Sequence, residues 1–329
     1  MNRSGHSSRE GTLVALSAAQ IDRAMGSVLA SACGDALGSQ YEFQPALGPD
    51  DIPTFGYGTF GHAPGEWTDD TAMAVPVLLR LSEGGSFEDP ASFAYVIDHW
   101  LDWSRTAKDI GIQTASVLSR LGPEPNEDEA REVSQRLHER LGRSAGNGAL
   151  MRTGPLALGY LGEGKESALA VAATRLAQLT HWEDDNAAAC TLWCLAIRHA
   201  ILSGEIDVMG QVQHIPAHMR SRWVDLLDEA QTPGATPTTF AATNGWVVAA
   251  LQASLSAINS TDSLIGALEL AIRGGNDTDT VAAITGALAG ARYGASQIPD
   301  EWITTVRGWP SKTASDLARL VSRVAGAPV

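Results

Sequence analysis

The stretch Gly274-Gly275-Asn276-Asp277-Thr278-Asp279-Thr280 places two aspartates among threonines, directly before an apolar run of helical spacing. A second stretch far upstream, Trp67-Thr68-Asp69-Asp70-Thr71, has matching chemistry and is also followed by apolar residues. Such runs predict a helix after each motif. We expect the fold to bring the two motifs into one pocket, so that four carboxylates meet at the starts of two helices.

Helical spacing of apolar residues recurs along the rest of the chain, whereas the alternation typical of strands is scarce. We expect helices over residues 18–38, 68–82, 90–104, 110–121, 127–141, 149–161, 165–179, 183–203, 219–230, 244–258, 261–273, 278–293 and 312–325. The predicted fold class is therefore all-α, a compact orthogonal bundle of many helices. Residues 1–17 are predicted to be a flexible N-terminal tail, and residues 18–329 a single all-helical domain.

Composition excludes several classes of function. Hydrophobic residues make up 44% of the 329 residues, enough for a full core. The net charge of −15 argues against a nucleic-acid groove or an anionic membrane surface as the main partner. No secretory signal or membrane span is visible, so we expect a cytoplasmic protein. The three cysteines, Cys33, Cys190 and Cys194, are too few for a disulfide framework and are expected to be small buried residues.

The acidic motifs have three interpretations: helix caps without a ligand, one bound ion, or a two-metal site. Capping explains one acid per helix start, but not two acids with hydroxyls at both. Glu42 adds a fifth carboxylate nearby. At about 5 Å and an effective dielectric near 20, each carboxylate pair repels by roughly 3 kcal/mol. Several such pairs exceed the net stability of a typical domain, about 5–15 kcal/mol. The cluster must therefore bind protons or cations.

The ligand types indicate which metal would bind. Carboxylates and hydroxyls are hard oxygen donors, which suit Mg²⁺, Mn²⁺ or Ca²⁺ and disfavour zinc. The segment after Asp279 is apolar, so it does not continue into a calcium loop of the EF-hand type. We therefore favour a two-metal site built from both motifs.

Two further signals are weak individually. Gly146-Asn147-Gly148 lies in a loop of small residues before a predicted helix, where backbone N–H groups can cradle a phosphate. The alternative is an ordinary Asn-Gly turn. His181 precedes a long predicted helix, where a cap or core role is the alternative to ligand binding. Asp109 stands at another helix start and is explained equally well as a cap.

Five motifs in order within residues 24–294 resemble those of the ADP-ribosylglycohydrolases, a group that includes dinitrogenase-reductase-activating glycohydrolases and ADP-ribosylhydrolases. They are Gly34-Asp35-Ala36-Leu37-Gly38 with Glu42, Trp67-Thr68-Asp69-Asp70-Thr71, Asn147-Gly148-Ala149-Leu150-Met151-Arg152, Thr180-His181, and Gly274-Gly275-Asn276-Asp277-Thr278-Asp279-Thr280. The resemblance implies an all-α catalytic domain with two Mg²⁺ or Mn²⁺ ions. It also implies hydrolysis of the C1″ glycosidic bond of mono-ADP-ribosylated protein, with release of ADP-ribose.

The resemblance assigns roles to residues of this chain. The implied metal ligands are Thr68, Asp69, Asp70, Asp277, Asp279 and Thr280; the catalytic residues are Glu42, Asp69 and Asp109; the substrate contacts are Asp35, Gly146, Asn147, Gly148 and His181. The metals would hold the 2″- and 3″-hydroxyls of the distal ribose while water attacks C1″. Glu42, Asp69 and Asp109 all stay open as the group that handles the proton.

Two other functions fit the same acidic pattern: a metal-dependent nucleotide phosphohydrolase, and a family member that binds ADP-ribose without turnover. Intact aspartates at all four metal positions argue against the second. For the hydrolase we favour an arginine N-linkage, because Asp109 can pair with a guanidinium. A serine O-linkage, a nucleic-acid base and a small-molecule conjugate stay open.

Overall fold

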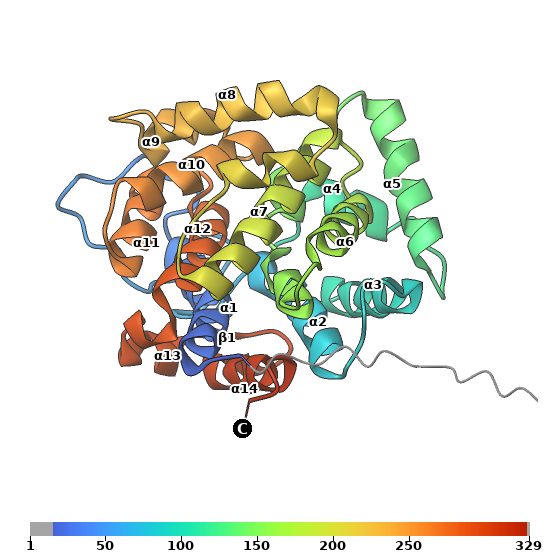
Figure 1. The fold of residues 1–329 in the computed structure, drawn as a ribbon, viewed down its shortest axis with the longest axis horizontal. Helices are drawn as coiled ribbons and strands as arrows, with labels where there is room; N and C mark the ends of the chain where they lie inside the picture. Colours follow the sequence, from blue (N-terminus) through green and yellow to red (C-terminus); the bar gives the residue numbers. More distant parts are fainter. Residues whose placement is uncertain (1–15, 328–329) are drawn as a thin grey trace, which may run out of the picture.

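The computed structural model describes residues 16–327, and helices dominate it (Figure 1). The α-helices are α1 Ala18–Gly38, α2 Asp69–Ser82, α3 Pro90–Ser104, α4 Ile112–Leu118, α5 Glu127–Leu141, α6 Glu166–Gln178, α7 Asp184–Ser203, α8 Arg220–Gln231, α9 Pro237–Phe240, α10 Val247–Asn259, α11 Leu264–Arg273, α12 Thr278–Tyr293, α13 Asp300–Thr305 and α14 Ala314–Val324. The only strands in the described part form a short antiparallel pair, β1 Arg307–Gly308 with β2 Lys312–Thr313. The predicted all-α fold class is confirmed.

Helices α1 and α12 pack against each other along their whole length, although they come from opposite ends of the chain. Gly26 faces Gly290 and Gly34 faces Ala282, so the two helices run antiparallel. A methyl group at Gly26 or Gly34 would overlap the backbone of α12. Glycine at these positions therefore allows the two backbones to touch. This contact holds the end of α1 next to the start of α12.

The remaining helices surround this pair. Helix α7 is apolar on almost every side, as expected for a helix inside a core. Its Trp193 is fully buried, and the indole Nε1–H donates a hydrogen bond to the carbonyl of Ile284 in α12 at 3.1 Å. Helices α5 and α8 lie at the periphery in Figure 1 and carry mostly polar outer faces. Nearly all of the buried apolar side chains form one continuous cluster.

The structure corrects several predicted elements. Residues 149–161 are not one helix: 3₁₀ segments cover Asn147–Ala149 and Gly154–Tyr160. Pro155 explains the interruption, because it has no N–H for an α-helical hydrogen bond. The other 3₁₀ segments are Met209–His214, Ala217–Met219, Ala241–Thr243 and Ala295–Gln297. Helices α9 and α13 and the strand pair were not predicted.

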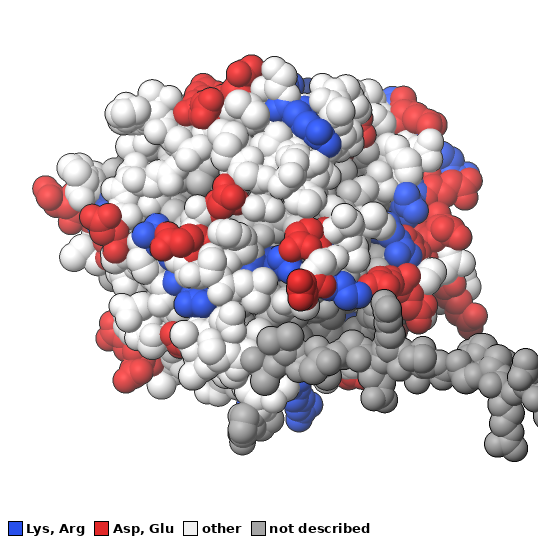
Figure 2. Space-filling view, in the orientation of Figure 1, with Lys and Arg blue, Asp and Glu red and all other residues white. Residues whose placement is uncertain are grey.

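Most of the predicted tail, residues 1–15, lies outside the described residues. Ser17, the last residue of the predicted tail, is described and caps α1. The three cysteine side chains are buried, as expected. Figure 2 shows carboxylates spread over one face with fewer basic groups between them. Within residues 16–327, no helix has both the length and the apolar composition needed to cross a bilayer.

Candidate active site

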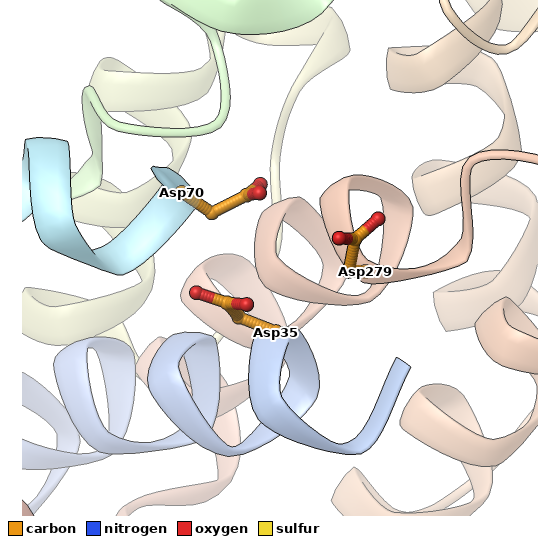
Figure 3. Close-up of side chains that lie close together, drawn as sticks. All are labelled: Asp35, Asp70 and Asp279. Atoms are coloured by element: carbon orange, nitrogen blue, oxygen red, sulfur yellow. The ribbon is translucent and has the colours of Figure 1, made fainter. Parts of the chain in front are cut away.

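Three helices bring their aspartates to one point. Asp35 near the end of α1, Asp70 in the first turn of α2 and Asp279 in the first turn of α12 converge (Figure 3). One carboxylate oxygen from each lies within 4.8 Å of the others. The side chains are 0%, 1% and 2% exposed, respectively. Gly38 permits this approach, because a Cβ there would lie only 2.6 Å from the Cα of Asp279.

Asp35 caps α2 from another helix. Its Oδ1 accepts hydrogen bonds from the backbone N–H of Thr68 at 2.9 Å and from the Thr68 hydroxyl at 2.8 Å. Its Oδ2 accepts from the N–H of Thr71 at 2.9 Å and from the Thr71 hydroxyl at 2.6 Å. Thr68 and Asp277, the N-cap residues of α2 and α12, make no side-chain capping bond of their own. Simple capping therefore does not explain the two acidic motifs.

Asp70 lacks the partners that a buried carboxylate requires. Its Oδ1 is buried and accepts no hydrogen bond within the described residues. Its Oδ2 lies 3.1 Å from the Thr68 hydroxyl and 3.4 Å from the Thr280 hydroxyl. The single Thr68 hydroxyl proton is also within reach of Asp35, so two carboxylate oxygens compete for it. Unsatisfied buried oxygens are unfavourable, and a cation would satisfy them.

Glu42, Asp277 and Asp279 form a second triad, with one oxygen of each within 4.8 Å of the others. An antiparallel bridge between Gln44 and Asn276 ties the segment after α1 to the segment before α12. This bridge holds Glu42 next to the second acidic motif. Asp279 belongs to both triads, so the two candidate cation positions are adjacent and share a ligand.

Two asparagines hold Asp277. The side-chain amide of Asn147 donates to Oδ2 of Asp277 at 2.7 Å and to the carbonyl of Asn244 at 3.0 Å. The side-chain oxygen of Asn244 accepts from the N–H of Asp277 at 3.2 Å. Asn147, which we predicted to contact substrate, thus also orients a carboxylate of the second triad. The sequence pattern did not single out Asn244.

Burial raises the pKa of the carboxyl groups throughout this cluster, and the neighbouring carboxylates add to the effect. The pKa values of Asp69, Asp70 and Asp279 rise well above the ordinary range. The pKa of Glu42 rises to about 9 for the same reasons. Burial raises the pKa of Asp35 to about 6 although four hydrogen bonds oppose the rise. Without cations the cluster therefore retains protons near neutral pH, and cations would displace them.

A cavity of about 620 Å³ adjoins the second triad. The predicted residues on its wall are Glu42, Asp69, Asp109, Gly146, Asn147, Gly148, His181, Asp277, Asp279 and Thr280. Asp35, Thr68 and Asp70 do not line this cavity and are buried in the first triad or beside it. The burial of Asp35 and its bonds to α2 favour a role in building the first triad over the predicted contact with substrate.

The cavity also has an apolar part that sequence reasoning missed. Phe43, Phe60 and Ile112 lie on its wall and are 58%, 42% and 88% exposed. The two phenyl rings meet edge to face, with centroids 6.1 Å apart. Phe43 has a φ of 60°, a conformation that bulky residues rarely adopt. The only sequence signal was the position of Phe43 directly after Glu42.

His181 packs against the glycine loop on another part of the wall. A Cβ at Gly148 would lie 3.3 Å from the Nε2 atom of His181, and one at Gly146 would lie 3.4 Å from it. Side chains at these positions would crowd the imidazole. The loop and the histidine, predicted separately, thus form one surface of the cavity.

A second cavity, of about 630 Å³, lies on the other side of Asp69 and Asp109, which line both. Its wall includes the ring of Trp103 and the basic side chains of Arg307 and Lys312. An ion pair between Lys108 and Glu66, 2.6 Å long, forms another part of its wall. The two carboxylates therefore stand between two spaces, each large enough for part of a substrate.

The chain is similar to known proteins over most of its length. The model of a family described as ADP-ribosylglycohydrolase matches residues 16–328. The ADP-ribosylarginine hydrolase Tri1 of Pseudomonas putida is 30% identical over 296 residues, which cover 87% of this chain and 74% of that protein. The ADP-ribosyl-(dinitrogen reductase) glycohydrolase of Rhodospirillum rubrum is 28% identical, over 86% of this chain and 90% of that protein. A solved structure described as an ADP-ribosylglycohydrolase-related protein complex matches with a TM-score of 0.71 at 28% identity, covering 93% of this chain and 98% of its own.

Proposed function

Because the chain belongs to the ADP-ribosylglycohydrolase family, we propose that it hydrolyses the C1″ N-glycosidic bond of ADP-ribosylated arginine in proteins and releases ADP-ribose. The observation that carries this proposal is the pair of carboxylate triads that share Asp279 beside a cavity of about 620 Å³. This volume falls within the range of ligand pockets, about 300–1,000 Å³. Relatives named ADP-ribosylarginine hydrolase support the arginine linkage.

The residues present fit two divalent cations. Asp35, Asp70 and Asp279 would hold one, and Glu42, Asp277 and Asp279 the other. The unpartnered Oδ1 of Asp70 supports this assignment, and the all-oxygen donor set favours Mg²⁺ or Mn²⁺. When bound, the ions would neutralise the carboxylates and hold the cis 2″- and 3″-hydroxyls of the distal ribose.

The predicted ligands outside these triads divide into two kinds. The hydroxyls of Thr68 and Thr280 both lie near Oδ2 of Asp70, so we retain them as candidate ligands. Asp69 belongs to neither triad and lines both cavities. We therefore assign Asp69 to the proton-transfer group with Asp109 and Glu42 rather than to the metal ligands.

Hydrolysis requires two proton transfers. The bond between C1″ and the guanidine nitrogen breaks, the nitrogen gains a proton, and water delivers hydroxide to C1″ while losing its own proton. Burial raises the pKa of Asp69 well above its ordinary value and also raises the pKa of Asp109, which favours the protonated form of each. Both side chains line the two cavities. We propose that Asp69 or Asp109 protonates the leaving nitrogen and that Glu42 faces the water.

The first cavity has the features needed for an ADP group. The glycine loop and His181 would contact the diphosphate, because backbone N–H groups and an imidazole N–H are donors suited to phosphate oxygens. The exposed rings of Phe43 and Phe60 would contact the adenine, since aromatic faces stack on nucleobases. The distal ribose would then lie at the triad end.

The second cavity would hold the arginine and the protein segment that carries it. The one of Asp69 and Asp109 that is ionised, at the junction of the cavities, can pair with the guanidinium. The ring of Trp103 offers an apolar surface for the arginine stem. Arg307 and Lys312 would contact acidic groups of the protein flanking the modified residue.

A panel of ADP-ribosyl conjugates tests the proposed function. Arginine-linked and serine-linked ADP-ribosyl peptides are incubated with the full chain in Mg²⁺, in Mn²⁺ or with a chelator. We expect free ADP-ribose from the arginine conjugate and no turnover with the chelator. Release of AMP or inorganic phosphate would instead identify a phosphohydrolase. Tight ADP-ribose binding without turnover of any conjugate would identify a non-catalytic binder.

A further inference from the structure

Arg152 is a buried cation that forms no ion pair within the described residues. Its side chain is 0% exposed. The guanidinium stacks on the ring of Trp100, with Cζ 4.0 Å from the ring centroid, and its Nε donates no hydrogen bond. Unpaired buried charges are strongly unfavourable, so their presence calls for an explanation beyond packing.

The guanidinium connects to the cavity through one hydroxyl. Nη2 of Arg152 donates to Oγ1 of Thr180 at 2.6 Å, and the same Oγ1 lies 2.7 Å from Nδ1 of His181. Thr180 is 1% exposed, and its hydroxyl makes no other hydrogen bond within the described residues. Arginine can only donate, so the hydroxyl accepts from Arg152.

Between Arg152 and His181, the proton of the Thr180 hydroxyl has only one acceptor within hydrogen-bond distance among the described residues, Nδ1 of His181. If Nδ1 of His181 carried a hydrogen, the Thr180 hydroxyl proton would be buried without an acceptor. The hydroxyl therefore donates to Nδ1, and the imidazole proton resides on Nε2. Nε2 lies next to Gly146 and Gly148 on the cavity wall and makes no hydrogen bond within residues 16–327.

We propose that Arg152 is a positioning residue that acts through Thr180 to hold His181 as the Nε2–H tautomer, which donates to the diphosphate of ADP-ribose. The buried guanidinium also supplies a positive potential behind the imidazole, and this potential suits an anion. The identity of the anion rests on the proposed function, whereas the tautomer follows from the hydrogen bonds alone. With its proton on Nε2, His181 can donate a hydrogen bond to an acceptor atom of a ligand at this position, but it cannot accept one from a donor atom there.

The tautomer is measured directly by nitrogen NMR of ¹⁵N-histidine-labelled protein, with the His181 signals assigned from a His181→Gln variant. We expect a protonated Nε2 and an unprotonated Nδ1 in the ligand-free protein. Thr180→Val removes the hydroxyl at nearly constant volume and should shift His181 toward Nδ1–H. Thr180→Ser retains the hydroxyl and should keep the wild-type tautomer. A protonated Nδ1 in the wild type would overturn the proposal.

The functional consequence is measured as ADP-ribose affinity by calorimetry in Mg²⁺. A hydrogen bond to a charged group contributes about tenfold or more to binding, so we expect Thr180→Val to weaken ADP-ribose by about tenfold. With an arginine-linked conjugate, KM should rise by a similar factor while kcat stays within about twofold. Thr180→Ser should restore both values. Unchanged ADP-ribose affinity in Thr180→Val would contradict the role of the relay.

The two proposals fail differently. If wild-type protein neither binds ADP-ribose nor turns over any conjugate, the proposed function is wrong. The NMR measurement still tests the His181 tautomer in that case, because it needs no ligand. If the wild type binds and turns over the arginine conjugate but Thr180→Val loses kcat with an unchanged KM, the positioning role is wrong and the hydrolase function is retained.

Discussion

The first cavity is lined by clustered carboxylates and by a wall that Arg152 supports through Thr180 and His181. Both regions bury charge, and the charges are opposite in sign. The carboxylates lie within 4.8 Å of one another in two triads and compete for too few hydroxyl protons. The single guanidinium contacts the ring of Trp100, the sulfur of Met73 and one hydroxyl.

The difference between several adjacent carboxylates and one isolated guanidinium indicates what kind of ligand each region binds. Like charges so close together repel, so the acidic triads need exchangeable protons or cations. The guanidinium is a single buried charge that stacks on Trp100 and donates one short hydrogen bond to Thr180. A ligand with a diphosphate at one end and a cis-diol at the other complements both regions, with cations bridging to the diol.

Asp279→Asn should produce the largest effect, because Asp279 belongs to both triads. Loss of both cation positions should lower kcat/KM by about 1,000-fold, the equivalent of about 4 kcal/mol of transition-state stabilisation. The measurement is release of ADP-ribose from an arginine conjugate in saturating Mg²⁺. Asp300→Asn, an exposed change on α13, is the matched control and should keep wild-type activity. Chelator-insensitive activity in Asp279→Asn would show that the triads are not the metal centre.

The free energy of unfolding should fall as the pH rises when no metal is present, and it should rise when Mg²⁺ is added. The folded-state pKa of Glu42 is about 9 against an ordinary 4.5, and that of Asp35 is about 6 against 3.8. These raised pKa values contribute stability that is complete below about pH 4 and is lost as the pH rises through 6 and 9.

Calorimetry of chelated protein should therefore show Tm falling between pH 5 and pH 9. Mg²⁺ at about 100 times its Kd should raise stability by about 2.7 kcal/mol, a Tm increase of about 4 °C for a chain of this length. The increase should grow with pH, because the cations bind the ionised carboxylates. A Tm that is independent of Mg²⁺ at every pH would contradict cation binding at the triads.

Arg152→Met tests the part of the cavity wall that Arg152 supports. Removal of the unpaired guanidinium should weaken ADP-ribose by about tenfold, since the His181 donor loses its support. The Tm of the ligand-free protein should not fall, because a buried unpaired charge is replaced by an apolar chain of similar length. Calorimetry measures both quantities. A large fall in Tm with unchanged affinity would make Arg152 purely structural.

The smallest expected effect concerns the second cavity. Arg307→Ala combined with Lys312→Ala should raise KM for an ADP-ribosylated protein by about two- to threefold, the size typical of exposed charge pairs. The same variant should keep the wild-type KM for free ADP-ribosylarginine, which lacks flanking residues. An equal change for both substrates would show that this cavity does not receive the protein segment.

Local pattern was sufficient for many features. The helices after Thr68 and Asp277 were predicted closely, because an acidic start and an apolar face are encoded within a few residues. The predicted helix over 149–161 failed, because Pro155 outweighs the apolar spacing around it. The residues Phe43 and Phe60 looked like ordinary loop residues, and only folding brings their rings together.

The sequence by itself determined the helical class, the acidic chemistry at two helix starts and the resemblance to one family, because these depend on neighbouring residues and ordered motifs. Tertiary structure alone decided that Asp35 caps α2, that Asp279 joins two triads, and that Arg152 reaches His181 through one hydroxyl. These relations depend on contacts of α1 with α2 and α12, and of the Arg152 segment with the end of α6. No local pattern encodes such distances, because packing of the whole chain sets them.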